Sequence, residues 1–236
     1  MKEKLKEKKP YYLIIARKTI FWLVMIMLIG EIAVLIFKDG IDRYRVIFTM
    51  VQLIAMLFVL RVPQFILNKF HFQIPYLLDF ILVVFAFCAF ILGDVFDFYN
   101  QFPFWDSLLH TFSGIIIAYI CFLIVRHLDK EYTIPISISP MFICIIVVCV
   151  ALALGAGWEI CEYISDDIFN TNSQQYMAST DSTLYNEKDI PLAGHEALQD
   201  TMKDLMLDLA GALVVATIGY QDLEKKRKKD EAKNGS

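Results

Sequence analysis

The sequence predicts an all-α, polytopic membrane protein. Of its 236 residues 57% are apolar, and they gather in runs too long and too weakly periodic for an ordinary soluble core. A helix needs about 20 apolar residues to cross the hydrocarbon of a bilayer, and most of the runs approach that length. Strands are excluded because the runs lack the alternation of a barrel strand, and lipid tolerates no open sheet.

Six apolar segments predict six transmembrane helices, which form one domain over residues 1–220. The second segment is short, and the sixth is polar at its start. The first segment follows a basic stretch, but it is too long for a signal-peptide core and lacks a small-residue cleavage site, so we keep it as a span. The predicted spans are residues 12–37, 46–62, 74–93, 104–125, 141–164 and 199–219.

The basic residues place both termini in the cytoplasm. The first ten residues and the tail at 221–236 are rich in lysine, whereas the loop at 165–198 has one basic residue, Lys188, among many acids. We therefore expect this loop outside. The loop at 38–45 disagrees because it carries three basic residues, but the two tails and the other loops outweigh it. The tails are expected to contact anionic membrane lipid and not nucleic acid.

Three predicted spans carry acidic stripes. The acids are spaced three or four residues apart, so each stripe occupies one face of its helix. In the six-span topology all three stripes lie at the outer ends of their helices and converge at the same depth. The stripes are Asp106 with His110 on the fourth span, Glu159, Glu162 and Asp166 on the fifth, and Asp200, Asp204 and Asp208 on the sixth.

The depth of these acids requires partners. Asp208 lies roughly 12 Å deeper than Asp200, at about 1.5 Å per residue. One carboxylate in hydrocarbon costs about 2.5 to 3.5 kcal/mol, so the stripes must face protein or water and not lipid. Each stripe has a glycine about one turn deeper, and small residues let helices approach closely. The glycines expected to pack below the site are Gly114, Gly155 and Gly211.

The convergence of several carboxylates on one imidazole predicts a divalent metal ion, which would relieve the repulsion between them. Asp106 and Asp200 lie in the first turns of their helices, where capping alone explains an acid. His195 and Glu196, in the preceding loop, could join the site. The predicted ligands are His110, Glu159, Glu162, Asp204 and Asp208, with Asp106, Asp166 and Asp200 as further candidates.

Two alternatives to a metal ion stay open. The carboxylates could share protons around a water-filled cavity, as in ion-coupled transport. They could also be structural, capping helices or bonding to loop residues. Outside the cluster, Asp79 is expected to pair with Arg61. The polar segment from Gln175 to Leu198 is expected to form a lid over the pocket.

Three sequence blocks resemble a known family. FPFWDSLLHTFSG, WEICEYISDDIFNTNSQ and DTMKDLMLDLAGAL, in this order, resemble the motif blocks of the YjdF-like bacterial inner-membrane proteins. More distantly, an aspartate and histidine on one span, a glutamate on the next and D-x3-[DN]-x2-G on the last are similar to VanZ-like proteins. The resemblance implies a multi-pass protein of the bacterial cytoplasmic membrane, and it supplies no reaction.

Three functions fit these features. The first is a metal-dependent hydrolase or transferase acting on lipid or lipid-linked head groups, with the ion activating water or polarising an ester or phosphoryl group. The second is a cation or proton-coupled transporter that uses the same acids. The third is a membrane interaction protein without catalysis. Below the acids the spans are almost entirely apolar, which favours a closed floor and therefore an enzyme, although no arginine stands beside the acids to bind phosphate.

Cysteine labelling tests the predicted topology. In a background without the five native cysteines, a cysteine at position 5 or 230 should be shielded from an impermeant external reagent, because the lysine-rich tails stay inside. A cysteine at position 180 should react. A tail that reacts from outside would contradict the orientation, and with it the convergence of the three stripes.

Overall fold

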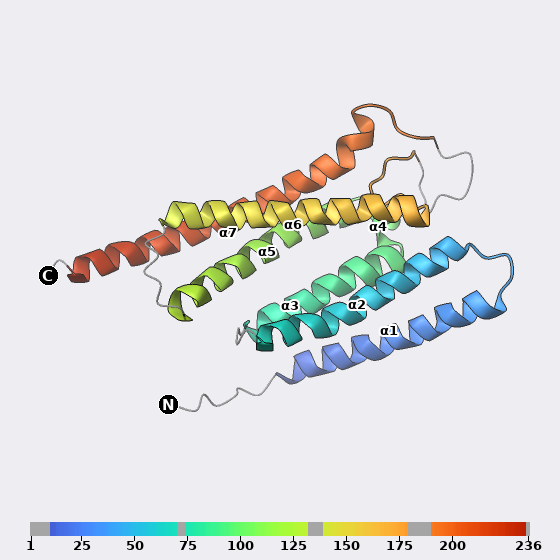
Figure 1. Ribbon diagram of the computed structural model, residues 1–236, viewed down its shortest axis with the longest axis horizontal. Coiled ribbons are helices and arrows are strands. Elements are labelled where there is room, and N and C mark those ends of the chain that lie inside the picture. The colour runs from blue at the N-terminus through green and yellow to red at the C-terminus, as the bar shows by residue number, and fades with distance from the viewer. Residues whose placement is uncertain (1–9, 70–73, 132–138, 179–189, 235–236) are drawn as a thin grey trace. The chain divides into compact units, whose positions relative to one another are not determined.

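The computed structural model describes residues 10–69, 74–131, 139–178 and 190–234 (Figure 1). These residues are almost entirely helical, and an isolated β-bridge joins Met177 to Pro191. The all-α prediction is confirmed. The elements are α1 (Tyr11–Phe37), α2 (Arg43–Lys69), α3 (Tyr76–Ala86), the π-helix η1 (Phe87–Val95), α4 (Phe98–Gln101), α5 (Trp105–Glu131), α6 (Pro140–Phe169), the 3-10 helix η2 (Glu196–Leu198) and α7 (Gln199–Asn234).

Within the described part of the chain, five helical segments are long and apolar enough to cross a membrane. They are α1, α2 as far as Arg61, α3 together with η1, α5 as far as His127, and α6. α7 is not among them, because acids interrupt its first turns and its last third is highly charged. The structure therefore supports a multi-pass membrane protein, while the sixth span and the cytoplasmic placement of both termini stay predictions.

The helices group into two compact units, Met1–Phe98 and Tyr99–Ser236. In the first unit α1, α2, α3 and η1 pack around a small apolar core. α1 begins directly after Pro10 and α3 directly after Pro75, and proline is well suited to the start of a helix because it lacks the N–H that would be unbonded there. The core residues are Val24, Leu53, Met56, Leu60, Val83, Ala86 and Ile91.

One arginine joins the three helices of the first unit. Arg17 of α1 donates to the backbone carbonyl of Leu60 in α2 and forms an ion pair with Asp79 of α3. The predicted pairing of Asp79 with Arg61 is therefore wrong. The guanidinium of Arg61 instead lies 5.1 Å from the centre of the Phe21 ring, where the ring face attracts a cation. Sequence spacing could not predict which helix faces Asp79.

In the second unit α5, α6 and α7 pack against one another, with α6 antiparallel to the other two. Arg126 Nη2 lies 2.8 Å from Asp222 Oδ2, so the C-terminal parts of α5 and α7 lie at the same end. Cys144, near the start of α6, donates to the carbonyl of Ala216 at 3.3 Å. The interior residues are Ala118, Cys121, Phe122, Cys144, Val147, Ala151, Ala212 and Ala216.

The ends of α6 are set by local residues. The Ser139 hydroxyl accepts a hydrogen bond from the backbone N–H of Phe142 at 3.2 Å, and Pro140 occupies the first helical position, a combination that favours a helix start. Asn170 ends the helix in the left-handed conformation, with φ of 52°, as asparagine often does. α6 therefore extends five residues beyond the predicted span, into the predicted external loop.

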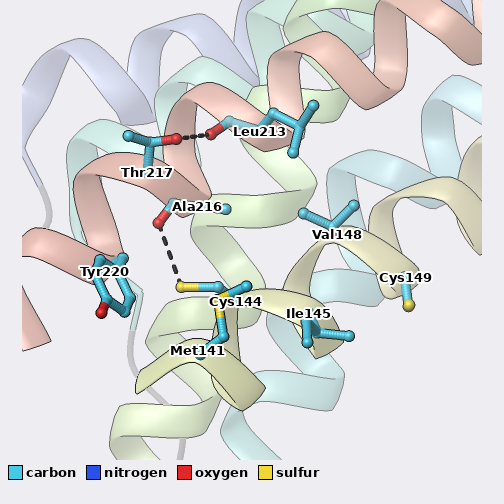
Figure 2. Close-up of a pocket in the computed structure, with 9 residues that line it drawn as sticks. All are labelled: Met141, Cys144, Ile145, Val148, Cys149, Leu213, Ala216, Thr217 and Tyr220. Carbon is cyan, nitrogen blue, oxygen red and sulfur yellow. Dashed lines mark hydrogen bonds between the residues drawn. The ribbon is translucent and has the colours of Figure 1, made fainter. Parts of the chain in front are cut away.

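An apolar groove runs along α6 and α7 on the second unit (Figure 2). Its volume is about 400 Å³. The thiol of Cys144 donates to Ala216, and the hydroxyl of Thr217 donates to the carbonyl of Leu213 at 2.8 Å. Two of the polar side chains in the lining are thus bonded to backbone, and most of the remaining lining residues are apolar. Its lining consists of Met141, Cys144, Ile145, Val148, Cys149, Leu213, Ala216, Thr217 and Tyr220.

The Arg17 pair gives a stability prediction. Arg17→Met should lower the free energy of unfolding by about 3 to 5 kcal/mol, because it removes the cation that pairs with the buried carboxylate of Asp79. Adding Asp79→Leu should recover part of that loss, since the buried charge is then removed. The measurement is a denaturation curve in detergent, with Arg61→Met, an arginine with an exposed side chain, as control. Equal losses in Arg17→Met and Arg61→Met would contradict the assignment.

Candidate metal centre

Three helices of the second unit bring carboxylates around one imidazole. His110 of α5 is 6% exposed. Its Nε2 lies 3.7 Å from Asp106 Oδ1 and 3.8 Å from Glu159 Oε1. Its Nδ1 lies 3.2 Å from Oδ2 of Asp208 in α7. The ring is therefore flanked by acid on both of its nitrogen atoms.

A subset of these groups has the spacing of a metal site. Asp106, His110 and Asp204 each offer one ligand atom, and these atoms lie within 4.8 Å of one another. An ion bound at about 2.0 to 2.6 Å from each ligand would fit between atoms at such separations. Glu159 approaches the same ring nitrogen, Nε2, as Asp106 does. α5, α6 and α7 thus each direct at least one donor to this place.

Several of these oxygen atoms are buried without a partner. Glu159 is 4% exposed and Asp204 is 1% exposed. Both oxygens of Glu159, Oδ1 of Asp204 and Oδ2 of Asp106 have no hydrogen-bond partner within the described residues. Buried polar atoms are nearly always bonded, and an unbonded one costs about 1 to 3 kcal/mol or more when charged. These oxygens therefore have room for further partners, which a cation, a proton or a water molecule could supply.

Asp208 lies on the opposite side of the imidazole from this group. It is 1% exposed, and its Oδ1 accepts a hydrogen bond from the hydroxyl of Ser113. That hydroxyl also lies 2.7 Å from the carbonyl oxygen of His110. Both carboxylate oxygens of Asp208 therefore have partners on α5.

The three predicted packing glycines lie where α7 touches its neighbours. A Cβ atom at Gly114 would overlap the backbone of Asp208, and one at Gly155 would overlap the Asp208 carboxylate. A Cβ atom at Gly211 would overlap the carbonyl of Thr111. Only glycine permits contacts this close, so these positions set the distances among α5, α6 and α7.

Two other predicted ligands lie beside the central group. Oε1 of Glu162 accepts a hydrogen bond from the indole N–H of Trp158, one turn earlier in α6, at 2.8 Å. Asp200, in the first turn of α7, lies 3.8 Å from the ammonium of Lys203. The charges of Asp106 and Glu159 still act on both acids. Each has a local partner, unlike the central oxygens.

Asp166 is occupied by the loop that follows α6. Its Oδ1 accepts from the Thr171 hydroxyl at 2.6 Å and from the Ser173 N–H at 2.7 Å, and its Oδ2 accepts from the Gln174 N–H at 3.0 Å. These bonds fit the structural alternative for this acid. His195 and Glu196, at the start of η2, are exposed.

The loop after α6 reaches the candidate metal centre through one side-chain amide. The side-chain nitrogen of Gln174 lies 3.2 Å from the carbonyl of Glu159 and 3.1 Å from the hydroxyl of Thr201, so it joins α6 to α7. The two ends of the long insertion also pair, since Ala178 N–H donates to the Ile190 carbonyl at 2.9 Å. Residues 179–189 of the predicted lid lie outside the described part of the chain.

Two polar side chains at the site, those of Ser113 and Gln174, were not predicted from the sequence. Ser113 follows His110 by three residues, so helical spacing does place it on the same face, but serine is common in helices and gave no separate signal. Gln174 belongs to a loop, and no periodic pattern predicts where a loop side chain docks. Asp106 was undervalued, because its place in the first turn has a sufficient local explanation.

A family model described as "Predicted membrane protein (DUF2238)" matches residues 20–225. The chain belongs to this family. The match includes the five candidate spans almost completely and every residue of the acidic cluster. An uncharacterized protein of Thermotoga maritima is 25% identical over 152 residues, which are 64% of this chain and 66% of the relative's length. No solved structure matches the chain.

The close approach at Gly114 can be tested with a matched pair of substitutions. Gly114→Ala should destabilise the protein by about 1 to 3 kcal/mol, because the new methyl meets backbone and not a movable side chain. Gly157→Ala, on α6, has open space around the added atom and should be neutral or stabilising by up to about 1 kcal/mol. Thermal melting in detergent measures both. Equal melting temperatures would contradict the packing of α5 on α7.

Proposed function

We propose that the second unit binds a divalent metal ion between α5, α6 and α7, and that this ion serves a membrane enzyme acting on lipid or lipid-linked head groups. The proposed ligands are Asp106, His110 through Nε2, Glu159 and Asp204. The observation that carries the proposal is the set of buried carboxylate oxygens without partners beside that nitrogen.

The donor set suits a hard or borderline cation. Carboxylate oxygens with one imidazole are the ligands chosen by Mg²⁺, Mn²⁺, Fe²⁺, Zn²⁺ and, with fewer nitrogens, Ca²⁺. Three acids around one imidazole repel each other in a medium of low dielectric, and a doubly charged cation would offset most of that charge. The same cation would supply partners to the unbonded oxygens. A single cation would thus reduce the repulsion between the carboxylates and also provide a partner for their unbonded oxygens.

The chemistry that such an ion supplies is the activation of water or the polarisation of an ester or phosphoryl oxygen. In this chain Asp106, Glu159 and Asp204 would hold it, and His110 would contribute a neutral nitrogen. Glu162 and Asp200 lie beside the group with local partners of their own, so they are placed to accept or release protons and not to complete the ligand set.

The interior below the centre favours an enzyme over a transporter. Eight buried residues pack among α5, α6 and α7, and all of them are apolar side chains or uncharged thiols. A transported cation would need polar groups along a second route, and this apolar cluster of described residues offers it no charged ligand.

Position along the sequence supports the relation to the YjdF-like proteins. Each of the three resembling blocks contains residues of the metal centre: the first includes Asp106 and His110, the second Glu159, and the third Asp204 and Asp208. We propose that the blocks describe one site. A bacterial inner membrane remains the proposed location on the same grounds.

One alternative rests on the same acids. Buried carboxylates that have no cation nearby lower their total charge by sharing protons. A proton-coupled transporter would use carboxylates in this partly protonated state. A membrane interaction protein without catalysis would need neither protons nor an ion at this place. These alternatives predict different responses to chelation.

The metal proposal is tested by melting curves and elemental analysis of the purified full chain. Chelator should lower the melting temperature of the parent, and an added divalent ion should restore it. A free ion concentration 100 times the dissociation constant raises the free energy of unfolding by about 2.7 kcal/mol. Asp204→Asn should weaken ion binding at least about 10-fold. The control is Asp222→Asn, an exposed aspartate on the same helix paired with Arg126 and Lys226. It should respond to chelator as the parent does.

The opposite result is specific. If the parent contains no ion and ignores chelator while Asp204→Asn is more stable than the parent, the acids share protons. If the substitution instead destabilises without any dependence on ions, the acids are structural. Either result overturns the metal proposal.

A further inference from the structure

We infer that Asp208 acts through His110 and not as a ligand: it accepts the Nδ1–H of the imidazole and so presents the bare Nε2 to Asp106, Glu159 and Asp204. This role rests on the proposed function in one respect, which is that the group bound by Nε2 is a metal ion. Asp208 is therefore a positioning residue.

The first argument is the geometry around the ring. The two imidazole nitrogens point in different directions, and Asp208 Oδ2 lies 3.2 Å from Nδ1. The other acids approach Nε2, at 3.7 Å for Asp106 and 3.8 Å for Glu159. A neutral imidazole has one N–H and one bare nitrogen, and a carboxylate accepts only from the N–H. The contact with Asp208 therefore selects the tautomer that leaves Nε2 free to bind a cation.

The second argument is that both carboxylate oxygens of Asp208 already have a partner on α5. Its Oδ2 is taken by Nδ1 of His110, and its Oδ1 by the hydroxyl of Ser113. In contrast, Asp204, one turn earlier on the same face of α7, keeps Oδ1 unbonded although it is equally buried. Two aspartates four residues apart are thus distinguished by their partners, and only Asp204 has a ligand position open.

The third argument is that α5 and α6 hold this carboxylate in one position. Gly155 of α6 leaves the space that the Asp208 carboxylate occupies, because a Cβ atom there would overlap Oδ2. Gly114 of α5 allows the backbone of the same residue to approach. A carboxylate fixed on three sides orients the ring that it contacts. Metal-bound histidines generally have such a partner on the other nitrogen, and its loss weakens metal binding about 10- to 100-fold.

The test measures which ring nitrogen keeps its proton. The full chain, labelled with ¹⁵N-histidine and purified in detergent with chelator, is examined by NMR at an alkaline pH where the imidazole is neutral. The His110 signals are those missing from His110→Gln. We expect Nδ1 to be protonated and Nε2 bare. A protonated Nε2, or an even mixture of the two tautomers, would overturn the inference.

Substitutions separate positioning from ligation. Asp208→Asn should abolish the Nδ1–H preference and weaken Mn²⁺ binding about 10- to 100-fold, while one ion per chain still binds at saturation. Asp204→Asn should leave the tautomer unchanged and weaken binding. Gly155→Ala keeps the charge of Asp208 but displaces its carboxylate, so it should shift the tautomer as Asp208→Asn does. A parental tautomer in Gly155→Ala would contradict the positioning role.

Two provisions keep the outcome interpretable. If Gly155→Ala does not fold, Ser113→Ala takes its place, because this substitution removes the hydroxyl that also holds the Asp208 carboxylate. In that case an unchanged tautomer in Asp208→Asn is by itself enough to overturn the inference. If the parent binds no Mn²⁺, the proposed metal function fails. The tautomer of His110 in the parent and in Asp208→Asn still decides the role of Asp208.

Discussion

The burial of Asp208 between α5 and α6 is the constraint on which the second unit depends. Its backbone fills the space left by Gly114, its carboxylate fills the space left by Gly155, and His110 and Ser113 satisfy its two oxygens. A carboxylate 1% exposed on a helix that packs against two candidate membrane spans would be strongly unfavourable without these contacts. Helix packing and the hydrogen bonds of one residue are therefore set together.

The same constraint explains why the other acids cannot separate. Once Asp208 fixes the approach of α5, α6 and α7, the side chains one turn away on each helix are held near Nε2 of His110. Asp204 and Glu159 then remain buried with oxygens that nothing in the described structure satisfies. A protein can retain such a cluster only if a ligand or protons offset the cost. The described buried cluster below the acids consists of apolar residues and thiols, so the buried acids of the cluster lie toward one end of the three-helix unit.

The sequence predicted the helices and the converging stripes well, because apolar length and helical spacing depend only on neighbouring residues. It could not rank the acids. In the structure Asp106 lies in the group with metal-site spacing and Asp208 contacts the other ring nitrogen of His110, and the difference between them comes from contacts with other helices. Asp166 looked like part of the stripe, yet its partners come from the loop after α6. The partner of Asp79 was missed for the same reason, since Arg17 lies 62 residues away in sequence.

The sixth predicted span illustrates how packing changes the meaning of composition. α7 is not apolar enough by itself to count as a span, but the deepest of its acids, Asp204 and Asp208, are each 1% exposed. Their charges face α5 and α6 and not the surroundings. A criterion that sums hydropathy along one helix counts these acids as if they met lipid, whereas the cost depends on what each side chain contacts. α7 packs on two apolar helices, from the Gln174 bridge to the Arg126 ion pair, and this contact is compatible with the predicted sixth span.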